Sequence, residues 1–327
     1  MRVGVIGVGN MGAEHVRILH HFVSGATVTM VAGPGRETVG GVAAMAGARA
    51  TSDSYAVITD PRVDAIVIAS PDDTHADLTI AAIRAGKPVM CEKPLAPSAA
   101  ECLRVIREET RAGGRLVSLG FMRRFDPAFT ELKSALAAGA CGTPRMVRCV
   151  SRTVSFEPGA DRYRSITGSA VHEFDIVPWL LGSAITEVAW DSPRTSAMAS
   201  FQDPQVILLH TEGGALAVAE LFLNARYGYD IRCEIIGDDG TLSIANPGRL
   251  VTDSAGTEST GFPADWRSRF ADAYRLELQA WVDAITTGSQ PALATAHDGL
   301  AAAAIAEAVI ASMTGGGARV AVHVPAA

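Results

Sequence analysis

The sequence predicts an α/β protein in which a doubly wound parallel sheet is followed by an α+β domain with a large, mostly antiparallel, open-faced sheet. Three observations predict this fold. Short apolar or β-branched runs alternate with helical patterns over the first 120 residues. A series of strands with turn signals at Gly-Gly and Asp-Asp-Gly follows, and two helical patterns close the chain. The change in pattern predicts two domains, residues 1–120 and 121–327, with the closing helices packed back near the first.

Length and charge narrow the class of protein. The chain has 327 residues, 48 % of them hydrophobic, and a formal net charge of −7. It can bury a substantial core, but its charge offers no attraction to nucleic acid or to an anionic membrane. Its five cysteines have no metal-ligand spacing, and their odd number suits a reducing compartment. Without a signal-peptide pattern or a spanning apolar run, we expect a cytoplasmic protein with a small-molecule partner and no bound metal.

The first domain is read as alternating strands and helices. The expected strands are "RVGVIGVG", "TVTMVAG", "DAIVIAS", "KPVMCEKP" and "RLVSLGF". The expected helices are "MGAEHVRILHHF", "THADLTIAAIRAG" and "SAAECLRVIREETRAGG". The second of these helices opens on a Thr-x-x-Asp capping pattern, and the third opens on a Ser98/Glu101 capping box. Right-handed crossovers between such strands build a doubly wound parallel sheet.

The second domain has a different rhythm. A helix over 168–182 carries His172 near its start. Residues 266–288 predict one long helix, and 297–316 predict the last one. The apolar stripe of the long helix is formed by Phe270, Tyr274, Leu278, Trp281 and Ile285. The expected strands are 143–154, 185–191, 206–214, 215–227, 229–240 and 241–246.

A glycine-rich turn joins the first strand to the first helix. Its residues Gly7, Gly9 and Gly12 form G-x-G-x-x-G, with Asn10 and Met11 inside the motif. The first glycine allows a tight turn, the second lets a pyrophosphate approach the backbone, and the third allows close helix–strand packing. Phosphates would sit at the helix N-terminus, where free N–H groups face them. In this strand–turn–helix context the motif predicts a dinucleotide-binding Rossmann domain, although the motif alone is also found in unrelated glycine-rich turns.

The end of the second strand bears on the choice of cofactor. A preference for NAD predicts an acidic residue there, because its carboxylate binds the ribose hydroxyls. This chain has Gly33 at that position, followed by Arg36, which can pair with a 2′-phosphate. The pattern favours NADP over NAD. The alternative is an ordinary solvated arginine in a Gly-Pro turn, which leaves NAD open.

Several motifs in order resemble one known family. The segments "SPDDTHADLTIAAIRAGKPVMCEKPLA" (70–96), "GFMRRFDP", "HEFDIVPWLLG" and "YGYDIRCEIIG" resemble the Gfo/Idh/MocA oxidoreductases, and in particular their inositol dehydrogenase branch. The resemblance implies hydride transfer between a nicotinamide and a carbinol of a cyclitol or sugar. It also implies a homo-oligomer, expected to be a tetramer. Carried onto this chain, it places cofactor contacts at Ser70, Pro71, Thr74, His75, Glu92 and Lys93.

Two residues are expected to handle the proton of the alcohol. Lys93 follows a parallel strand, where ligands of such sheets bind, and its ammonium can stabilise negative charge on the reacting oxygen. His172 is the expected proton acceptor, because an imidazole titrates near neutral pH. The alternatives are a solvated lysine after a strand and a buried structural histidine. Glu92 is expected to hold either the local backbone or the cofactor.

The main departure from the family lies one helical turn before His172. Members of the family usually have an aspartate there, whereas this chain has Gly168 followed by Ser169. A glycine supplies neither a proton relay nor an orienting carboxylate, and the serine hydroxyl carries no charge. An altered mechanism, a slow enzyme, a substrate that brings its own acid, or an inactivated copy would each explain the glycine.

The resemblance also implies a polyol pocket with an aromatic wall. An apolar wall with polar tips suits a ring that carries many hydroxyl groups. Thr153 stands where inositol dehydrogenases tend to have an asparagine, so a cyclitol other than myo-inositol is also expected to fit. Each of these positions is also compatible with a core or surface role. The residues implied are Met122, Arg123, Thr153, Gly168, Ser169, His172, Tyr227, Tyr229 and Trp266.

Three functions are compatible with these residues. The first is a dehydrogenase or reductase of a cyclitol or sugar, favoured because Lys93 and His172 are both present. The second is a non-catalytic dinucleotide-binding sensor or regulatory protein, favoured by Gly168. The third is another reaction that begins with a transient oxidation, such as an elimination or an epimerisation. The exact substrate, the carbon oxidised and the physiological direction are not specified by the sequence.

Overall fold

The computed structural model describes residues 1–156, 161–195, 201–244 and 251–326. The chain forms two compact units. Unit 1 contains residues 1–125, 272–304 and 324–327, and unit 2 contains 126–271 and 305–323. The last helix therefore contributes residues to both units.

Unit 1 is built on a six-stranded parallel sheet, as the sequence predicts. Its strands are β1 (Arg2–Ile6), β2 (Thr27–Ala32), β3 (Arg49–Thr51), β4 (Ala65–Ile68), β5 (Val89–Cys91) and β6 (Val117–Leu119). Their order is β3-β2-β1-β4-β5-β6, and every pair is parallel. All four residues of β4 are inaccessible to solvent, which explains its continuous apolar sequence. From the central pair β1 and β4, the strands β2 and β3 are added on one side and β5 and β6 on the other, so the sheet is doubly wound.

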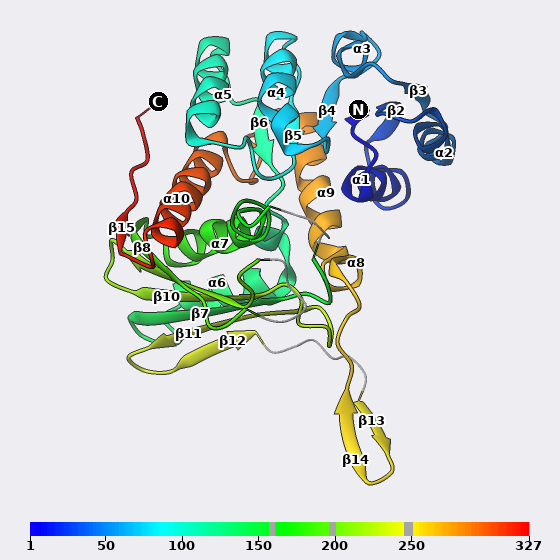
Figure 1. The fold of residues 1–327 in the computed structure, drawn as a ribbon. Helices are drawn as coiled ribbons and strands as arrows, with labels where there is room; N and C mark the ends of the chain where they lie inside the picture. Colours follow the sequence, from blue (N-terminus) through cyan, green and yellow to red (C-terminus); the bar gives the residue numbers. More distant parts are fainter. Residues whose placement is uncertain (157–160, 196–200, 245–250, 327) are drawn as a thin grey trace. The chain divides into compact units, whose positions relative to one another are not determined.

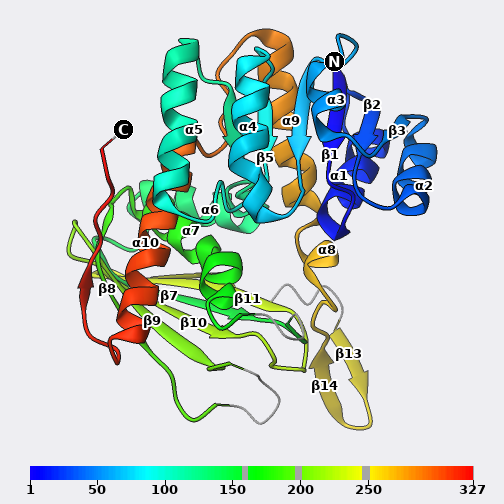
Figure 2. The same ribbon diagram turned by 45° about the horizontal axis from the view of Figure 1, so that its top comes forward.

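Helices connect these strands. They are α1 (Asn10–His21), α2 (Arg36–Ala46), α3 (Ser54–Thr59), η1 (Asp72–Thr74), α4 (His75–Arg84), α5 (Ala99–Ala112) and η2 (Met122–Phe125). The hydroxyl of Ser98 accepts the Glu101 N–H and Gly113 ends α5 in the left-handed region, so both predicted ends are confirmed. The predicted cap of α4 is wrong, because the Thr74 hydroxyl instead donates to the Pro71 carbonyl. Helices α4 and α5 lie side by side (Figures 1 and 2).

The predicted long helix over 266–288 is interrupted. It is divided into α8 (Trp266–Arg269) and α9 (Ala271–Thr287), because Phe270 between them has a non-helical backbone with φ −115° and ψ 20°. Four of the five stripe residues are buried, and Ile285 is half-buried. Helix α9 lies beside α1, since its Tyr274 ring meets the His15 ring edge-on and Gln279 bonds the backbone of Ser24.

The last helix, α10 (Ala296–Thr314), is strongly apolar. Among the described residues it is the single helix long and apolar enough to cross a bilayer by length and composition. However, 61 % of its most apolar window is buried inside the protein, as expected for a core helix.

Unit 2 contains a seven-stranded mixed sheet that is mostly antiparallel, as predicted. The strand order is β12-β11-β7-β10-β9-β8-β15, and β10 with β7 is its one parallel pair. Buried and partly exposed residues alternate along β9 and β10, so one face is covered and the other is open. Its strands are β7 (Pro144–Arg152), β8 (Ile185–Asp191), β9 (Gln205–Thr211), β10 (Leu216–Phe222), β11 (Asp230–Gly237), β12 (Thr241–Ile244) and β15 (Val320–Ala321).

Two helices lie over one face of this sheet, α6 (Pro127–Ala137) and α7 (Val171–Leu181) (Figure 1). A π-helical segment, η3 (Ser165–Ala170), leads directly into α7. The hairpin β13 (Val251–Ser254) and β14 (Thr257–Thr260) was not predicted from the sequence. The predicted strand 241–246 is observed as far as Ile244, and its last two positions lie outside the described residues.

Candidate functional site

The glycine-rich turn of unit 1 has the geometry that the motif predicts. Gly7 has φ +92°, and a Cβ there would lie 2.4 Å from the backbone of Ala69. A Cβ on Gly12 would lie 1.9 Å from the carbonyl oxygen of Gly7, so α1 can approach β1 only with a glycine at this position. Gly9, which precedes α1, has open space around it. The loop therefore presents bare backbone and the N-terminus of α1 to a ligand, as a pyrophosphate requires.

A hollow of about 490 Å³ opens beside this loop. It contains Gly7 and the segment after β4, where Ser70, Pro71 and Thr74 are predicted cofactor contacts. It lies beyond the carboxyl ends of β1, β2 and β4, the usual ligand position of a doubly wound sheet. Its other lining residues are Ile6, Gly33, Pro34, Ser52, Asp53, Ser54, Tyr55, Asp73, Asp77 and Leu78.

The second strand ends at a position with little room for a side chain. A Cβ on Gly33 would lie 2.8 Å from Cγ2 of Val8, so an acidic residue here would push against the glycine-rich turn. Arg36 is the exposed first residue of α2 and is absent from the lining of the hollow. Asp53 lines the hollow, but its Oδ1 accepts the N–H groups of Tyr55 and Ala56 as the cap of α3. Asp53 was not predicted as a site residue. Its position as the N-cap of α3 could have indicated it.

His75 is buried rather than exposed to the hollow. Its Nδ1 lies 2.7 Å from the carbonyl oxygen of Pro94, and its Nε2 lies 2.9 Å from that of Ser70. The side chain is almost inaccessible to solvent. Burial opposes the charged form, but Cys91 and the two carbonyls outweigh it and raise the pKa of His75 to about 10. His75 therefore connects two segments of the predicted site, the one after β4 at Ser70 and the one after β5 at Pro94.

Lys93 follows β5 directly, and its backbone is held by the residue before it. The Lys93 N–H donates to Oε2 of Glu92 at 3.2 Å, while Oε1 of Glu92 lies 2.7 Å from Nε2 of His15. Burial favours the neutral acid, but His15 outweighs it and the pKa of Glu92 is lowered. Glu92 thus holds the local backbone, one of the two roles expected for it. His15 was missed, because its partner is 77 positions away along the chain.

Two of the predicted substrate residues belong to unit 1. Met122 and Arg123 lie in the short helix η2 directly after β6, and both are buried. The remaining predicted substrate residues belong to unit 2.

His172 is the second residue of α7 and stands two positions after the end of the π-helical segment. Its side chain is half-buried, whereas the neighbouring Glu173 and Asp175 are buried. Glu173 accepts a hydrogen bond from the hydroxyl of Ser151 at 2.6 Å, which joins α7 to the end of β7. A π-helical turn is uncommon and often lies at a functional site.

Gly168 lies inside that π-helical segment, under the side chain of Arg164. A Cβ on Gly168 would lie 3.3 Å from Nε and 3.4 Å from Cζ of Arg164. The surface next to Gly168 therefore carries a guanidinium, and no carboxylate stands at this turn of the helix. Arg164 was not predicted as a site residue. Only its spacing of four residues before Gly168 could have indicated it.

The predicted aromatic residues are held by neighbours within unit 2. The Tyr227 hydroxyl donates to Asp230 at 2.6 Å and accepts from Arg152 at 3.1 Å. The Thr153 hydroxyl donates to the Leu223 carbonyl, so it links the ends of the neighbouring strands β7 and β10. Tyr229 packs edge-on against Phe270, and the guanidinium of Arg267 lies 4.5 Å from the centre of the Trp266 ring.

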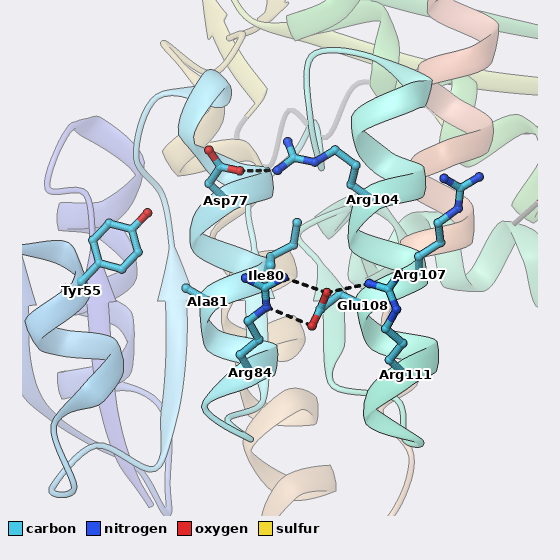
Figure 3. Close-up of a pocket in the computed structure, with 9 residues that line it drawn as sticks. All are labelled: Tyr55, Asp77, Ile80, Ala81, Arg84, Arg104, Arg107, Glu108 and Arg111. Atoms are coloured by element: carbon cyan, nitrogen blue, oxygen red, sulfur yellow. Dashed lines mark hydrogen bonds and ion pairs between the residues drawn. The ribbon is translucent and has the colours of Figure 1, made fainter.

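A second hollow of about 520 Å³ lies between α4 and α5 (Figure 3). Arg84 and Arg111 are both directed at Glu108, and Arg104 is directed at Asp77. In these three pairs the arginine is at least half exposed, and such surface pairs contribute about 0–1 kcal/mol each. None of the predicted site residues lies here. In the described parts of the chain, no group of three or more His, Cys, Asp or Glu is placed to hold a metal ion.

The parallel sheet, glycine-rich turn and adjoining hollow define a dinucleotide-binding α/β protein. Residues 1–121 match the NAD-binding Rossmann fold of an oxidoreductase family, GFO_IDH_MocA, and residues 133–322 match the C-terminal alpha/beta domain of that family. The chain belongs to the Gfo/Idh/MocA oxidoreductases, as its motifs indicated.

The chain is similar to several named relatives. It is 47 % identical over 321 residues to inositol 2-dehydrogenase 2 of Paenarthrobacter aurescens (strain TC1), covering 96 % of both chains. It is 47 % identical over 314 residues to inositol 2-dehydrogenase 1 of Saccharopolyspora erythraea, covering 95 % of this chain and 93 % of the relative. Its structure is similar to that of myo-inositol dehydrogenase from Lactobacillus casei in complex with NAD(H) and myo-inositol. That likeness has a TM-score of 0.95 and 29 % identity, and it covers 100 % and 98 % of the two chains.

Proposed function

We propose that this protein is an NAD(P)-dependent dehydrogenase or reductase that transfers hydride between a nicotinamide and a carbinol of a cyclitol or sugar. The observation that carries the proposal is 47 % identity over 96 % of both chains to a protein named inositol 2-dehydrogenase 2. A structural relative at 29 % identity holds NAD(H) and myo-inositol. These relatives give no support to the non-catalytic alternative.

The residues of unit 1 fit the dinucleotide. Gly7, Gly9 and Gly12 leave the backbone open, and the N-terminus of α1 offers N–H groups to a pyrophosphate. Ser70, Pro71 and Thr74 line the hollow beside the loop. Asn10, Met11, Arg36 and Lys93 are further proposed cofactor residues. His75 and Glu92, which were expected to contact the cofactor, are proposed to act through the backbone groups that they hydrogen-bond. The bound nicotinamide supplies the hydride acceptor for oxidation, or the hydride donor for reduction.

Lys93 and His172 are the proposed catalytic residues. In the oxidising direction, the substrate O–H bond breaks as a C=O bond forms and hydride leaves the carbon. An imidazole nitrogen of His172 takes the proton, and the Lys93 ammonium donates a hydrogen bond to the reacting oxygen, stabilising its developing negative charge. The side chains proposed to bind the polyol are Met122, Arg123, Thr153, Ser169, Tyr227, Tyr229 and Trp266, with Gly168 at the same surface.

Two finer points belong to the proposal. NADP is the preferred cofactor, supported by the absence of a carboxylate at Gly33 and by the exposed Arg36 nearby. The protein acts in a reducing, cytoplasmic compartment, supported by five free thiols.

We further propose a homo-oligomer, a tetramer, assembled through the open face of the sheet in unit 2. Apolar residues on that face of β9 and β10 stay partly exposed, among them Val206, Leu208, Val218 and Phe222. An apolar sheet face of this kind is covered in most proteins by another element or another chain. Light scattering coupled to size exclusion tests the assembly, and a monomer would contradict it.

The experiment that tests the function follows nicotinamide absorbance with a panel of cyclitols and sugars, using NAD and NADP in turn. We expect turnover by the native protein. Lys93→Met and His172→Gln should each lower kcat by about 100-fold or more, within the range for removing a group that contacts the reacting atoms. His297→Gln, an exposed histidine, is the control and should keep full activity. Cofactor binding without turnover on any substrate, or full activity in Lys93→Met, would contradict the proposal.

A further inference from the structure

Two buried histidines hold the backbone on opposite sides of Lys93. On the N-terminal side, Glu92 accepts the Lys93 N–H and is itself bonded to His15 of α1. On the C-terminal side, the Pro94 carbonyl lies 2.7 Å from Nδ1 of His75. Both imidazoles are almost fully excluded from solvent.

The contacts of His75 specify its protonation state. Carbonyl oxygens only accept hydrogen bonds, and each ring nitrogen of His75 faces one, at Pro94 and at Ser70. A neutral imidazole carries a single N–H and would leave one carbonyl facing a ring lone pair. Only the imidazolium satisfies both acceptors. Cys91 is the titratable side chain that faces the ring, and its thiol donates to the Glu92 carbonyl.

His15 holds the backbone on the other side of Lys93, through Glu92. Its Nε2 donates to the Glu92 carboxylate, whose other oxygen accepts from Lys93. Gly120 lies beside the carboxyl group, and a Cβ there would come within 3.3 Å of it, so any larger residue at 120 would crowd Glu92. His15 lies three residues after Gly12 in the same helix. Through Glu92 it therefore connects the helix that follows the glycine-rich turn to the backbone of Lys93.

We propose that His75, as an imidazolium at neutral pH, and His15, through Glu92, are positioning residues that fix the backbone of Lys93 relative to the dinucleotide loop. The proposal rests on the catalytic role proposed for Lys93. Each histidine links one flank of the lysine to an element that carries cofactor residues: His75 bonds the Ser70 carbonyl after β4, and His15 bonds Glu92 from within α1. The backbone of Lys93 is then anchored on both sides, which fixes the position from which its side chain extends.

The charge on His75 is tested directly by ring ¹⁵N NMR of the full-length protein labelled on histidine. Resonances missing from His75→Gln assign the ring. We expect both nitrogens at imidazolium positions at pH 7 and pH 8, because the two carbonyls require two N–H groups. A neutral tautomer at pH 7 would overturn this part of the proposal, and the measurement needs no activity.

The positioning role is tested by kinetics of His75→Gln, His15→Gln and His15→Leu. We expect kcat to fall by about 10- to 100-fold in His75→Gln and His15→Leu, the loss that follows a small displacement of a catalytic group. His15→Gln keeps an N–H for Glu92 and should recover part of that loss. His20→Gln, an exposed histidine of the same helix, is the matched control and should behave as the native protein.

A combined variant separates positioning through Lys93 from a general structural effect. If His75 acts through the lysine, His75→Gln should reduce kcat much less in a Lys93→Arg background than in the native one. Equal losses in both backgrounds would contradict the proposal. If Lys93→Met is fully active, the proposed function has failed. If Lys93→Met is inactive while His15→Leu and His75→Gln keep native kcat, the function stands and this inference has failed.

Discussion

The guanidinium of Arg164 lies against Gly168, with Nε 3.3 Å from the point where a Cβ would stand. The family resemblance implies an aspartate at this position, four residues before His172, where this chain has the glycine. An aspartate introduced at 168 would therefore meet a cation before it met the imidazole.

Restoring the acid alone should change turnover little. We expect Gly168→Asp to alter kcat by less than about tenfold, because Arg164 captures the new carboxylate in a charge-assisted hydrogen bond. Gly168→Asp combined with Arg164→Gln should have a higher kcat than Gly168→Asp alone. Steady-state kinetics with the same cyclitol panel measures both. A rise of about 100-fold in the single variant would mean that Arg164 does not hold the acid.

Two glycines of the glycine-rich turn should have different roles: Gly12 should be needed for stability, and Gly9 for dinucleotide binding. Gly12→Ala places a Cβ 1.9 Å from a carbonyl oxygen, so we expect a loss of about 3 kcal/mol in the free energy of unfolding, the upper end for overpacking. Gly9→Ala has open space and should change stability by less than about 0.5 kcal/mol. It should nevertheless weaken dinucleotide binding, because the methyl group stands where the pyrophosphate approaches. Urea denaturation and fluorescence titration measure the two effects; equal destabilisation would contradict the prediction.

Arg36 should decide the preference between the two cofactors. Arg36→Ala removes the cation proposed to pair with a 2′-phosphate, so kcat/KM for NADP should fall by about tenfold or more. The value for NAD should stay within about twofold, since NAD has no such phosphate. The ratio of kcat/KM for the two cofactors is the measurement. A native enzyme that already prefers NAD would refute the NADP assignment.

His75 should make stability depend on alkaline pH. Its folded pKa is raised to about 10, above the ordinary value of 6.5, although burial alone would lower it. The stabilisation from its charged form is therefore complete below about pH 6.5 and is lost as pH rises through about 10. Urea denaturation of the native protein and His75→Gln should differ most at low pH and converge toward pH 10. Cys91→Ser controls for the nearby thiol. A difference that grows with pH would contradict the sign.

Removing one partner of the buried ion pair Asp126–Arg269 should lower the free energy of unfolding strongly, whereas replacing both partners by apolar residues should lower it little. Its two hydrogen bonds are 2.9 and 3.1 Å long, and both side chains are 5 % exposed. Asp126→Asn leaves a buried guanidinium without its counter-charge, so we expect a loss of about 3–5 kcal/mol. Asp126→Leu with Arg269→Met should recover most of that stability. Calorimetry or urea denaturation measures both variants, and a mild effect of Asp126→Asn would disprove the prediction.

Much of the fold could be predicted from local patterns. The apolar run at β4 indicated a strand covered on both faces, and the Ser98 capping box marked the start of α5. The interruption at Phe270 could not be predicted, because the apolar stripe continues across it. The cap at Thr74 failed because its hydroxyl found the Pro71 carbonyl at hydrogen-bonding distance instead.

The candidate site was predicted unevenly. The glycines, Lys93 and His172 were identified from motifs, and their roles stay predictions. His15, Arg164 and the buried position of His75 were not identified. The partner of His15 is 77 residues away, and the acceptors of His75 are backbone atoms that no side-chain motif records.

The sequence by itself determined the alternation of strands and helices and the turn at Gly7, because these depend on side-chain period and on local backbone sterics. The tertiary structure alone decided which buried charges meet. His15 reaches Glu92 because β1 and β4 lie at the centre of the sheet and β5 follows β4 in the strand order. His75 is charged because the same order brings the ends of β4 and β5 within reach of one ring. Hydrogen bonds between residues distant in sequence depend on this packing, and no local pattern encodes it.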